Sequence, residues 1–193
     1  GRARLEGRGG PVGVLVAAPD PDALPGEAQA TPVHEVAPPA AGDVALLMYT
    51  SGTTGMPKGV MLTQGNLAAN AHAISAEHAL QPADRVLAVL PLYHINAFAV
   101  TMLAPLAHGG SLAMPPKFSA GRFWEQAAQT QCSWINVVPT MISYLLEGEE
   151  PPSAQTASIR FCRSASAPLP PAHHRAFAQK FGIGIVATMG LPG

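Results

Sequence analysis

The stretch Tyr49-Thr-Ser-Gly-Thr-Thr-Gly-Met-Pro-Lys-Gly59 fits neither a hydrophobic core nor an amphipathic helix. Its three glycines permit positive φ angles and close approach of a ligand to the backbone. Its four hydroxyl side chains and Lys58 add hydrogen-bond donors, and successive backbone N–H groups in such a turn form an anion-binding concavity. The composition therefore predicts a phosphate-binding loop.

Two other interpretations compete for this loop. A turn rich in Gly, Ser and Thr between two strands is common and needs no ligand. The ordinary nucleotide P-loop requires Gly directly before its Lys and Ser or Thr directly after it, whereas Pro57 and Gly59 flank Lys58 here. Because Pro57 favours extended or turn backbone at Met56, the loop need not run straight into a helix.

The composition indicates one domain, or part of one, with a substantial core. Of the 193 residues 48% are hydrophobic and 12% charged, and the net charge is −1. Neither a nucleic acid nor an anionic membrane surface is expected as a partner. No apolar run reaches the roughly 18 to 20 residues of a membrane span, and no signal peptide pattern is visible. Cys132 and Cys162 are predicted to be reduced core thiols, hence a cytoplasmic protein.

The chain divides at residue 42. Residues 1–42 hold a short apolar strand at 12–16 and an acidic connection rich in Pro and Ala. In residues 43–193 short apolar runs alternate with helical patterns, one of them behind a possible cap at Thr63. The strands are predicted at 44–49, 85–90, 111–114, 134–138, 159–163 and 183–187. Further helices are predicted at 96–107, 119–130 and 139–147, with a polar loop at 148–158 and a last helix that begins at Pro170 or Pro171 and ends at Phe181.

This alternation predicts an α/β fold with a mostly parallel sheet and helices on both faces. Ligands of such sheets bind beyond the carboxyl ends of the strands. The segments that follow the predicted strands are therefore the candidates for a binding site.

The stretch from Tyr49 to Gly59 resembles the phosphate-binding signature of the adenylate-forming superfamily, which includes acyl-CoA synthetases, luciferases and the adenylation domains of peptide synthetases. The resemblance extends over about residues 43–191. It implies that the loop grips the β- and γ-phosphates of ATP while a substrate carboxylate attacks the α-phosphate. The residues implied are Thr50, Ser51, Gly52, Thr53, Thr54, Gly55 and Lys58.

Other segments resemble this family in the expected order. Tyr93 and His94 resemble the segment that lines the acyl pocket, with His94 as a possible gate. The other motifs favour this role over the alternative that His94 is a structural residue that caps a strand. Pro139 and Thr140 resemble the border of that pocket, or simply begin a helix. The turn implied to lie against adenine, which could also be a plain strand-to-helix turn, comprises Ser164, Ala165, Ser166, Ala167 and Pro168. Arg163, just before it, is expected to be a solvated surface arginine.

The resemblance breaks off at the end of the chain. Met189, Gly190 and Leu191 fit the opening of the next nucleotide-binding motif, but Pro192 and Gly193 stand where the family has Thr and a Glu that helps to hold Mg²⁺. The family's ribose-binding Asp, hinge and small C-terminal domain with its catalytic lysine are also missing. These features predict a central piece of the large domain, incomplete at both ends and inactive alone. Such a piece is expected to expose apolar surface and to self-associate.

For the parent enzyme the resemblance implies ATP, Mg²⁺ and CoA, with a small carboxylate as substrate. Acyl-adenylate forms first, and the thiol of CoA then displaces AMP. No Asp follows Arg85, which favours an acyl-CoA synthetase over a peptide-synthetase adenylation domain. Short or polar acids such as oxalate fit best, with long-chain and aryl acids open. The rival hypotheses are a non-catalytic fragment that binds nucleotide weakly and an unrelated α/β protein that binds sugar or phosphate.

Overall fold

A five-stranded parallel sheet lies at the centre of the fold. The computed structural model describes residues 3–5, 12–14, 38–50 and 58–188. The strand order is β6-β5-β7-β8-β9, and each neighbouring pair is parallel. In chain order the strands are β5 (Arg85–Ala88), β6 (Ser111–Ala113), β7 (Trp134–Val137), β8 (Phe161–Ser164) and β9 (Ile185–Ala187). The predicted α/β class is confirmed.

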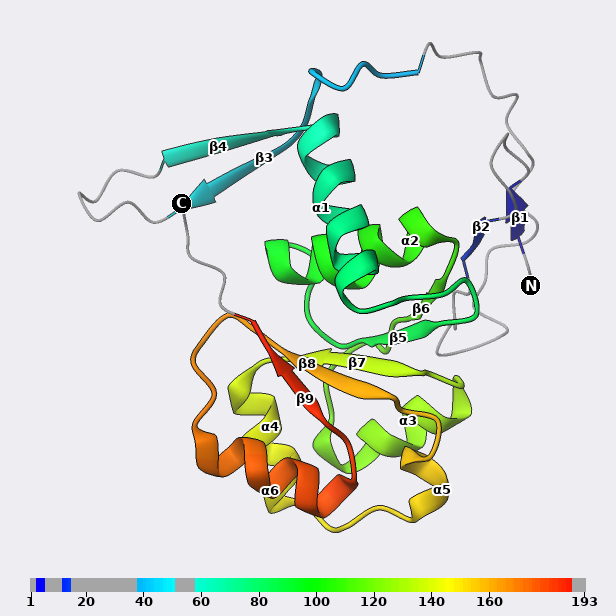
Figure 1. Ribbon diagram of the computed structural model, residues 1–193, viewed down its shortest axis with the longest axis vertical. Helices are drawn as coiled ribbons and strands as arrows, with labels where there is room; N and C mark the ends of the chain where they lie inside the picture. The colour runs from blue at the N-terminus through cyan, green and yellow to red at the C-terminus, as the bar shows by residue number, and fades with distance from the viewer. Residues whose placement is uncertain (1–2, 6–11, 15–37, 51–57, 189–193) are drawn as a thin grey trace.

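Helices cover both faces of this sheet (Figure 1). One face carries α1 (Gln64–Glu77), the π-helix η2 (Ala97–Leu103) and α2 (Ala104–His108). The other face carries the 3₁₀ turn η3 (Ala120–Arg122), α3 (Phe123–Gln129), α4 (Pro139–Glu147), α5 (Ser153–Thr156) and α6 (Pro171–Phe181). Both faces of the sheet are therefore buried.

The two helical layers enclose two separate apolar clusters. Side chains alternate between the faces of a strand, so Val86 packs with Trp134 on the α1 side while Leu87 packs with Ile135 on the other. All four of these side chains are fully buried. Burial on both faces explains why these strands read as continuous apolar runs in the sequence.

Local signals fix the ends of the helices. The Thr63 hydroxyl accepts a hydrogen bond from Asn66 N (3.2 Å), and Thr63 N donates to Asn66 Oδ1 (3.1 Å), so the predicted cap of α1 is confirmed as a capping box. Prolines occupy the first positions of α4 and α6: the predicted bounds of α4 are confirmed, and of the two prolines predicted to open α6 it is Pro171 that does so. Gly182 ends α6 with a φ of +67°, a conformation that glycine adopts without strain.

The first predicted strand does not belong to the parallel sheet. β3 (Val44–Thr50) pairs antiparallel with β4 (Lys58–Thr63), a strand that the sequence patterns missed. Figure 1 shows this hairpin lying apart from the sheet and leading into α1. Its apolar side chains stay accessible: Leu47 is 51% exposed and its cross-strand neighbour Met61 is 67% exposed. An apolar run signals a strand but does not say which sheet it joins.

Three further elements differ from expectation. The helix at 96–107 is a π-helix continued by an α-helix, and α5 interrupts the predicted polar loop at 148–158. Near the N-terminus, β1 (Ala3–Leu5) and β2 (Val12–Val14) form a small antiparallel pair. None of the helices within residues 58–188 is long and apolar enough to cross a membrane.

Candidate functional site

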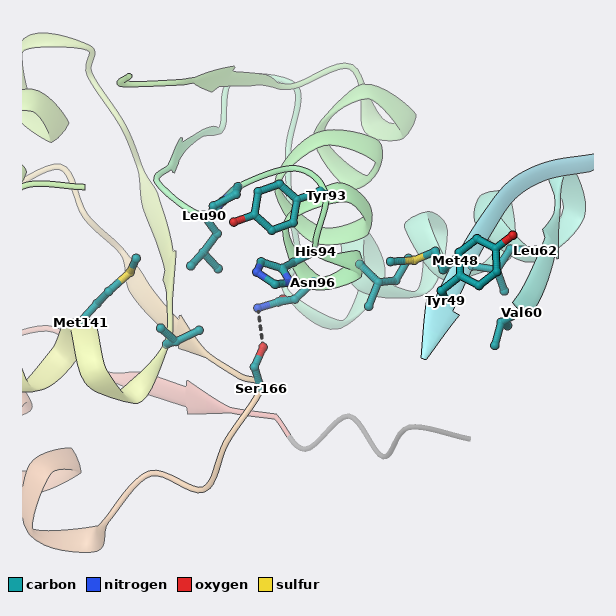
Figure 2. Close-up of a pocket in the computed structure, with 13 residues that line it drawn as sticks. Met48, Tyr49, Val60, Leu62, Leu90, Tyr93, His94, Asn96, Met141 and Ser166 are labelled. Atoms are coloured by element: carbon teal, nitrogen blue, oxygen red, sulfur yellow. Dashed lines mark hydrogen bonds between the residues drawn. The ribbon is translucent and has the colours of Figure 1, made fainter. Parts of the chain in front are cut away.

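A cleft of about 1040 Å³ lies between the β3–β4 hairpin and the carboxyl end of the parallel sheet. Its walls come from the hairpin, the segment after β5, the start of α4 and the turn after β8 (Figure 2). The lining is Met48, Tyr49, Val60, Leu62, Leu90, Pro91, Tyr93, His94, Ile95, Asn96, Val138, Met141 and Ser166. Most of these side chains are apolar, and a few polar groups lie together on one wall, which is typical of a small-molecule site.

The hairpin places the ends of the phosphate-loop stretch side by side. Thr50 is the last residue of β3 and pairs with Lys58, the first residue of β4. The predicted phosphate ligands Ser51, Gly52, Thr53, Thr54 and Gly55 lie outside the described residues. Tyr49, the first residue of the stretch, lines the cleft.

Tyr93 and His94 lie in the cleft immediately after β5. His94 N donates to Pro91 O (3.1 Å), which closes a turn and directs both side chains outward. Their rings lie with centroids 4.5 Å apart, and both residues are exposed. The structure thus places both predicted pocket residues on the cleft wall, and their role as acyl-pocket residues stays a prediction.

The turn after β8 contributes a single residue to the lining, Ser166. Ser164 and Ala165 are buried, whereas Ala167 and Pro168 are exposed beyond the turn. Ser166 has a φ of +75°, an uncommon conformation for a residue other than glycine. Such strain is often held in place at binding sites.

Two groups of predicted site residues lie off the cleft or beyond the description. Pro139 and Thr140 begin α4 but are not part of the lining, which their neighbours Val138 and Met141 supply instead. Met189, Gly190 and Leu191 lie outside the described residues.

Arg163 is not a solvated surface residue, and that expectation was wrong. Its Nη1 donates to Asn96 Oδ1 (2.7 Å) and to Asn136 Oδ1 (3.1 Å). Burial lowers the pKa of the Arg163 guanidinium to about 10, so the group stays cationic at neutral pH. Arg163 lies on β8, and its hydrogen bond to Asn96 shows that its side chain faces the η2 side of the sheet. Its neighbour Cys162 faces the opposite side, because side chains alternate along a strand.

Sequence reasoning also missed Asn96 and Asn136. Asn136 is fully buried in the middle of β7, where all four positions are buried. A polar residue inside an otherwise apolar strand departs from the local pattern, and such departures mark functional or strained positions. That signal was present in the sequence, but the partners of Asn136 were not.

Within residues 38–50 and 58–188 no three His, Cys, Asp or Glu side chains converge to hold a metal ion. The Mg²⁺ implied by the family resemblance thus has no such cluster among the described side chains.

Comparison with known proteins identifies the family of the chain. The model of the AMP-binding enzymes matches residues 5–191. The sulfoacetate–CoA ligase of Cupriavidus necator is 56% identical over 191 residues, and the oxalate–CoA ligase of Arabidopsis thaliana is 35% identical over 152 residues. These alignments cover 98% and 77% of this chain but only 37% and 30% of the ligases.

A solved structure has a similar fold. The crystal structure of ATP-bound MatB from Rhodopseudomonas palustris superposes with a TM-score of 0.72 at 31% identity. The match covers 79% of this chain and 30% of that protein, so the chain corresponds to part of the large domain. The chain belongs to the family of AMP-binding enzymes, among relatives that are acid–CoA ligases.

Proposed function

We propose that this chain supplies the phosphate-binding hairpin and part of the acyl- and adenine-binding cleft of an AMP-forming acid–CoA ligase. The observation that carries the proposal is the cleft itself. It brings the base of the Tyr49–Gly59 stretch to one wall and His94 and Ser166 to another. These segments are far apart in the sequence, and the fold brings them to one cleft.

The reaction proceeds in two steps. An oxygen of the substrate carboxylate attacks the α-phosphorus of ATP, the bond to the bridging oxygen breaks, and pyrophosphate leaves with acyl-AMP bound. The thiolate of CoA then attacks the acyl carbon, and AMP leaves. Residues of this chain contribute positioning and charge: Lys58 and the loop backbone bind phosphate oxygens, and the apolar walls exclude water.

The proposed substrate is a short acid that carries a second acidic group. The 56% identity with sulfoacetate–CoA ligase and the 35% identity with oxalate–CoA ligase support this class, because both acids are small dianions. Since the chain covers about a third of each ligase, the complete activity is proposed for the polypeptide that contains these residues.

Two measurements test the proposal. Calorimetric titration of the chain with ATP should show binding that Lys58→Ala weakens by about ten- to a hundredfold, because a charge-assisted hydrogen bond contributes about 1.5–3 kcal/mol. Lys117→Ala is the matched control, since Lys117 is exposed after β6 and away from the cleft lining. ATP–pyrophosphate exchange over a panel of carboxylates, in the polypeptide that contains the chain, should depend on the acid and on Lys58 and Thr54.

Equal ATP affinity in wild type and Lys58→Ala would refute the assigned phosphate site. A polypeptide that binds ATP but supports no exchange with any carboxylate would instead favour a non-catalytic nucleotide-binding role. Equal binding of ATP and simple sugar phosphates would favour a phosphate site that does not select adenine nucleotides.

A further inference from the structure

A hydrogen-bonded group of three side chains lies directly behind the polar wall of the cleft. Asn96 directly precedes η2, Asn136 lies on β7 and Arg163 lies on β8. Asn96 Oδ1 accepts from Arg163 Nη1 (2.7 Å) and from Asn136 Nδ2 (3.4 Å), while Asn136 Oδ1 accepts from the same Nη1 (3.1 Å). Three elements of the fold thus converge on one guanidinium.

The charge of this guanidinium is not neutralised within the described residues. The ion pairs Arg160–Asp84 and Arg122–Glu125 do not include Arg163. Arg163 Nε is buried without a hydrogen-bond partner. Burying a cation without a carboxylate costs stability, because neutral amides satisfy hydrogen bonds but cancel no charge. Arg160, three residues earlier, has a carboxylate partner, because its guanidinium pairs with Asp84 at 2.7 Å.

The group also fixes the orientation of the Asn96 amide. Because Oδ1 accepts from Arg163 and Asn136, the NH₂ group must point the other way, toward the cleft, where Nδ2 donates to Ser166 Oγ (3.2 Å; Figure 2). An amide nitrogen carries two hydrogens, and Ser166 takes one of them. The second N–H is available to an acceptor in the cleft, next to His94 in the lining.

We propose that Asn96 is the specificity residue that binds the second anionic group of a short dianionic acid, with Arg163 as the positioning residue behind it. Arg163 holds the amide in the donating orientation and supplies the positive potential that a monoanionic acid leaves unused. This inference rests on the proposed function for the substrate class, but it concerns binding and needs no turnover.

The test compares two acids of nearly the same shape. Sulfoacetate carries a sulfonate and a carboxylate, whereas methylsulfonylacetate replaces one sulfonate oxygen with a methyl group and is a monoanion. Calorimetric titration of the chain with each acid, in the presence of ATP, should show at least about tenfold tighter binding of sulfoacetate, which corresponds to one charge-assisted hydrogen bond.

The variant Asn96→Asp separates recognition from folding. Its carboxylate gives Arg163 the ionic partner that it lacks, so the melting temperature should stay or rise, while the preference for sulfoacetate should disappear through charge repulsion. Asn70→Asp makes the same chemical change on the exposed surface of α1 and should leave the preference intact. Arg163→Met should lose the preference, and Arg163→Lys, which keeps the charge, should restore part of it.

The affinities for the two acids decide whether Asn96 and Arg163 recognise the second anionic group. Equal affinity for the two acids, or no binding of either, overturns the inference even if ATP binding and pyrophosphate exchange support the proposed function. An Asn96→Asp variant that melts like the wild type and still prefers sulfoacetate also overturns it. A preference lost in Asn96→Asp and in Arg163→Met, retained in Asn70→Asp and partly restored in Arg163→Lys supports it.

Discussion

Replacing Asp84 by asparagine should destabilise the fold far more than an equivalent change at the surface. The Asp84 carboxylate is buried just before β5 and accepts four hydrogen bonds. Oδ1 accepts from Ser133 Oγ (2.7 Å) and Arg160 Nε (3.2 Å), and Oδ2 accepts from Gln81 N (2.7 Å) and Arg160 Nη2 (2.7 Å). The carboxylate thereby links the starts of β5, β7 and β8.

The magnitude follows from these partners. The amide of Asp84→Asn keeps one oxygen, which can remain on Gln81 N and Arg160 Nη2. Its NH₂ group then faces Ser133, whose hydroxyl can rotate to accept, and Arg160 Nε, which cannot. One charge-assisted bond and the ionic attraction to Arg160 are lost. Because the Arg160 side chain is 45% exposed, solvent screens part of this loss, and we expect about 1.5–3 kcal/mol.

The loss should also depend on pH. Burial alone would raise the pKa of Asp84, but hydrogen bonds from Ser133, Gln81 N and Arg160 together with the charge of Arg160 lower it overall. A carboxyl group with a lowered pKa stabilises the fold above its unfolded pKa of about 3.9 and loses that contribution as pH falls through the folded value. The difference between wild type and Asp84→Asn should therefore be constant near neutral pH and narrow below about pH 4.

Urea unfolding followed by the fluorescence of Trp124 and Trp134, both buried, measures this difference. Glu125→Gln is the control, because its pair with Arg122 is long (3.7 Å) and exposed and should contribute less than about 0.5 kcal/mol. An Asp84→Asn effect no larger than that of Glu125→Gln, or one that persists unchanged at pH 3, would refute the reasoning.

Three further changes test other parts of the structure. Ser166→Gly should give a protein more stable than Ser166→Ala by about 1 kcal/mol in thermal unfolding, because φ is +75° there and both variants lack the hydroxyl; equal stability would contradict the backbone conformation. The Cys132 and Cys162 thiols, both buried and with pKa values raised by burial, should react with a thiol reagent only after unfolding, and rapid reaction of the folded chain would place one at the surface. Replacing the exposed pair Leu47 and Met61 by serine should reduce self-association in sedimentation analysis, and an unchanged association constant would exclude the hairpin as the contact.

The elements with local signals were predictable residue by residue. Pro139 and Pro171 open helices whose bounds follow from a fixed φ and a missing N–H, and Gly182 closes α6 because only glycine takes a positive φ without strain. The Thr63 cap likewise depends on atoms only three residues apart. Such interactions lie within a single turn of chain, so the sequence contains all that decides them.

The pairing of strands was less predictable. The apolar run at 44–49 has the composition of a sheet strand, yet it pairs with its chain neighbour β4 rather than with β5. The pairing of a strand depends on which apolar surface of the folded chain packs against it. The residues of the strand itself do not specify that surface. In the neighbouring strand at 58–63, Lys58 and Gly59 were predicted as part of the loop and residues 60–62 were assigned to no element, because a glycine and a lysine are atypical of a strand start.

The cleft shows the same division between local and long-range information. The glycine and hydroxyl pattern of residues 49–59, with the segments around His94 and Ser166, was enough to predict the family, while phosphate binding by this stretch stays a prediction. The burial of Arg163 was not predictable, because it depends on Asn96, 67 residues away, and on Asn136, 27 residues away. An arginine in a short strand looks the same in sequence whether its side chain faces water or the amides of Asn96 and Asn136. Only the packing of η2 against β5 and β7 brings Asn96 beside Arg163 and turns the arginine inward.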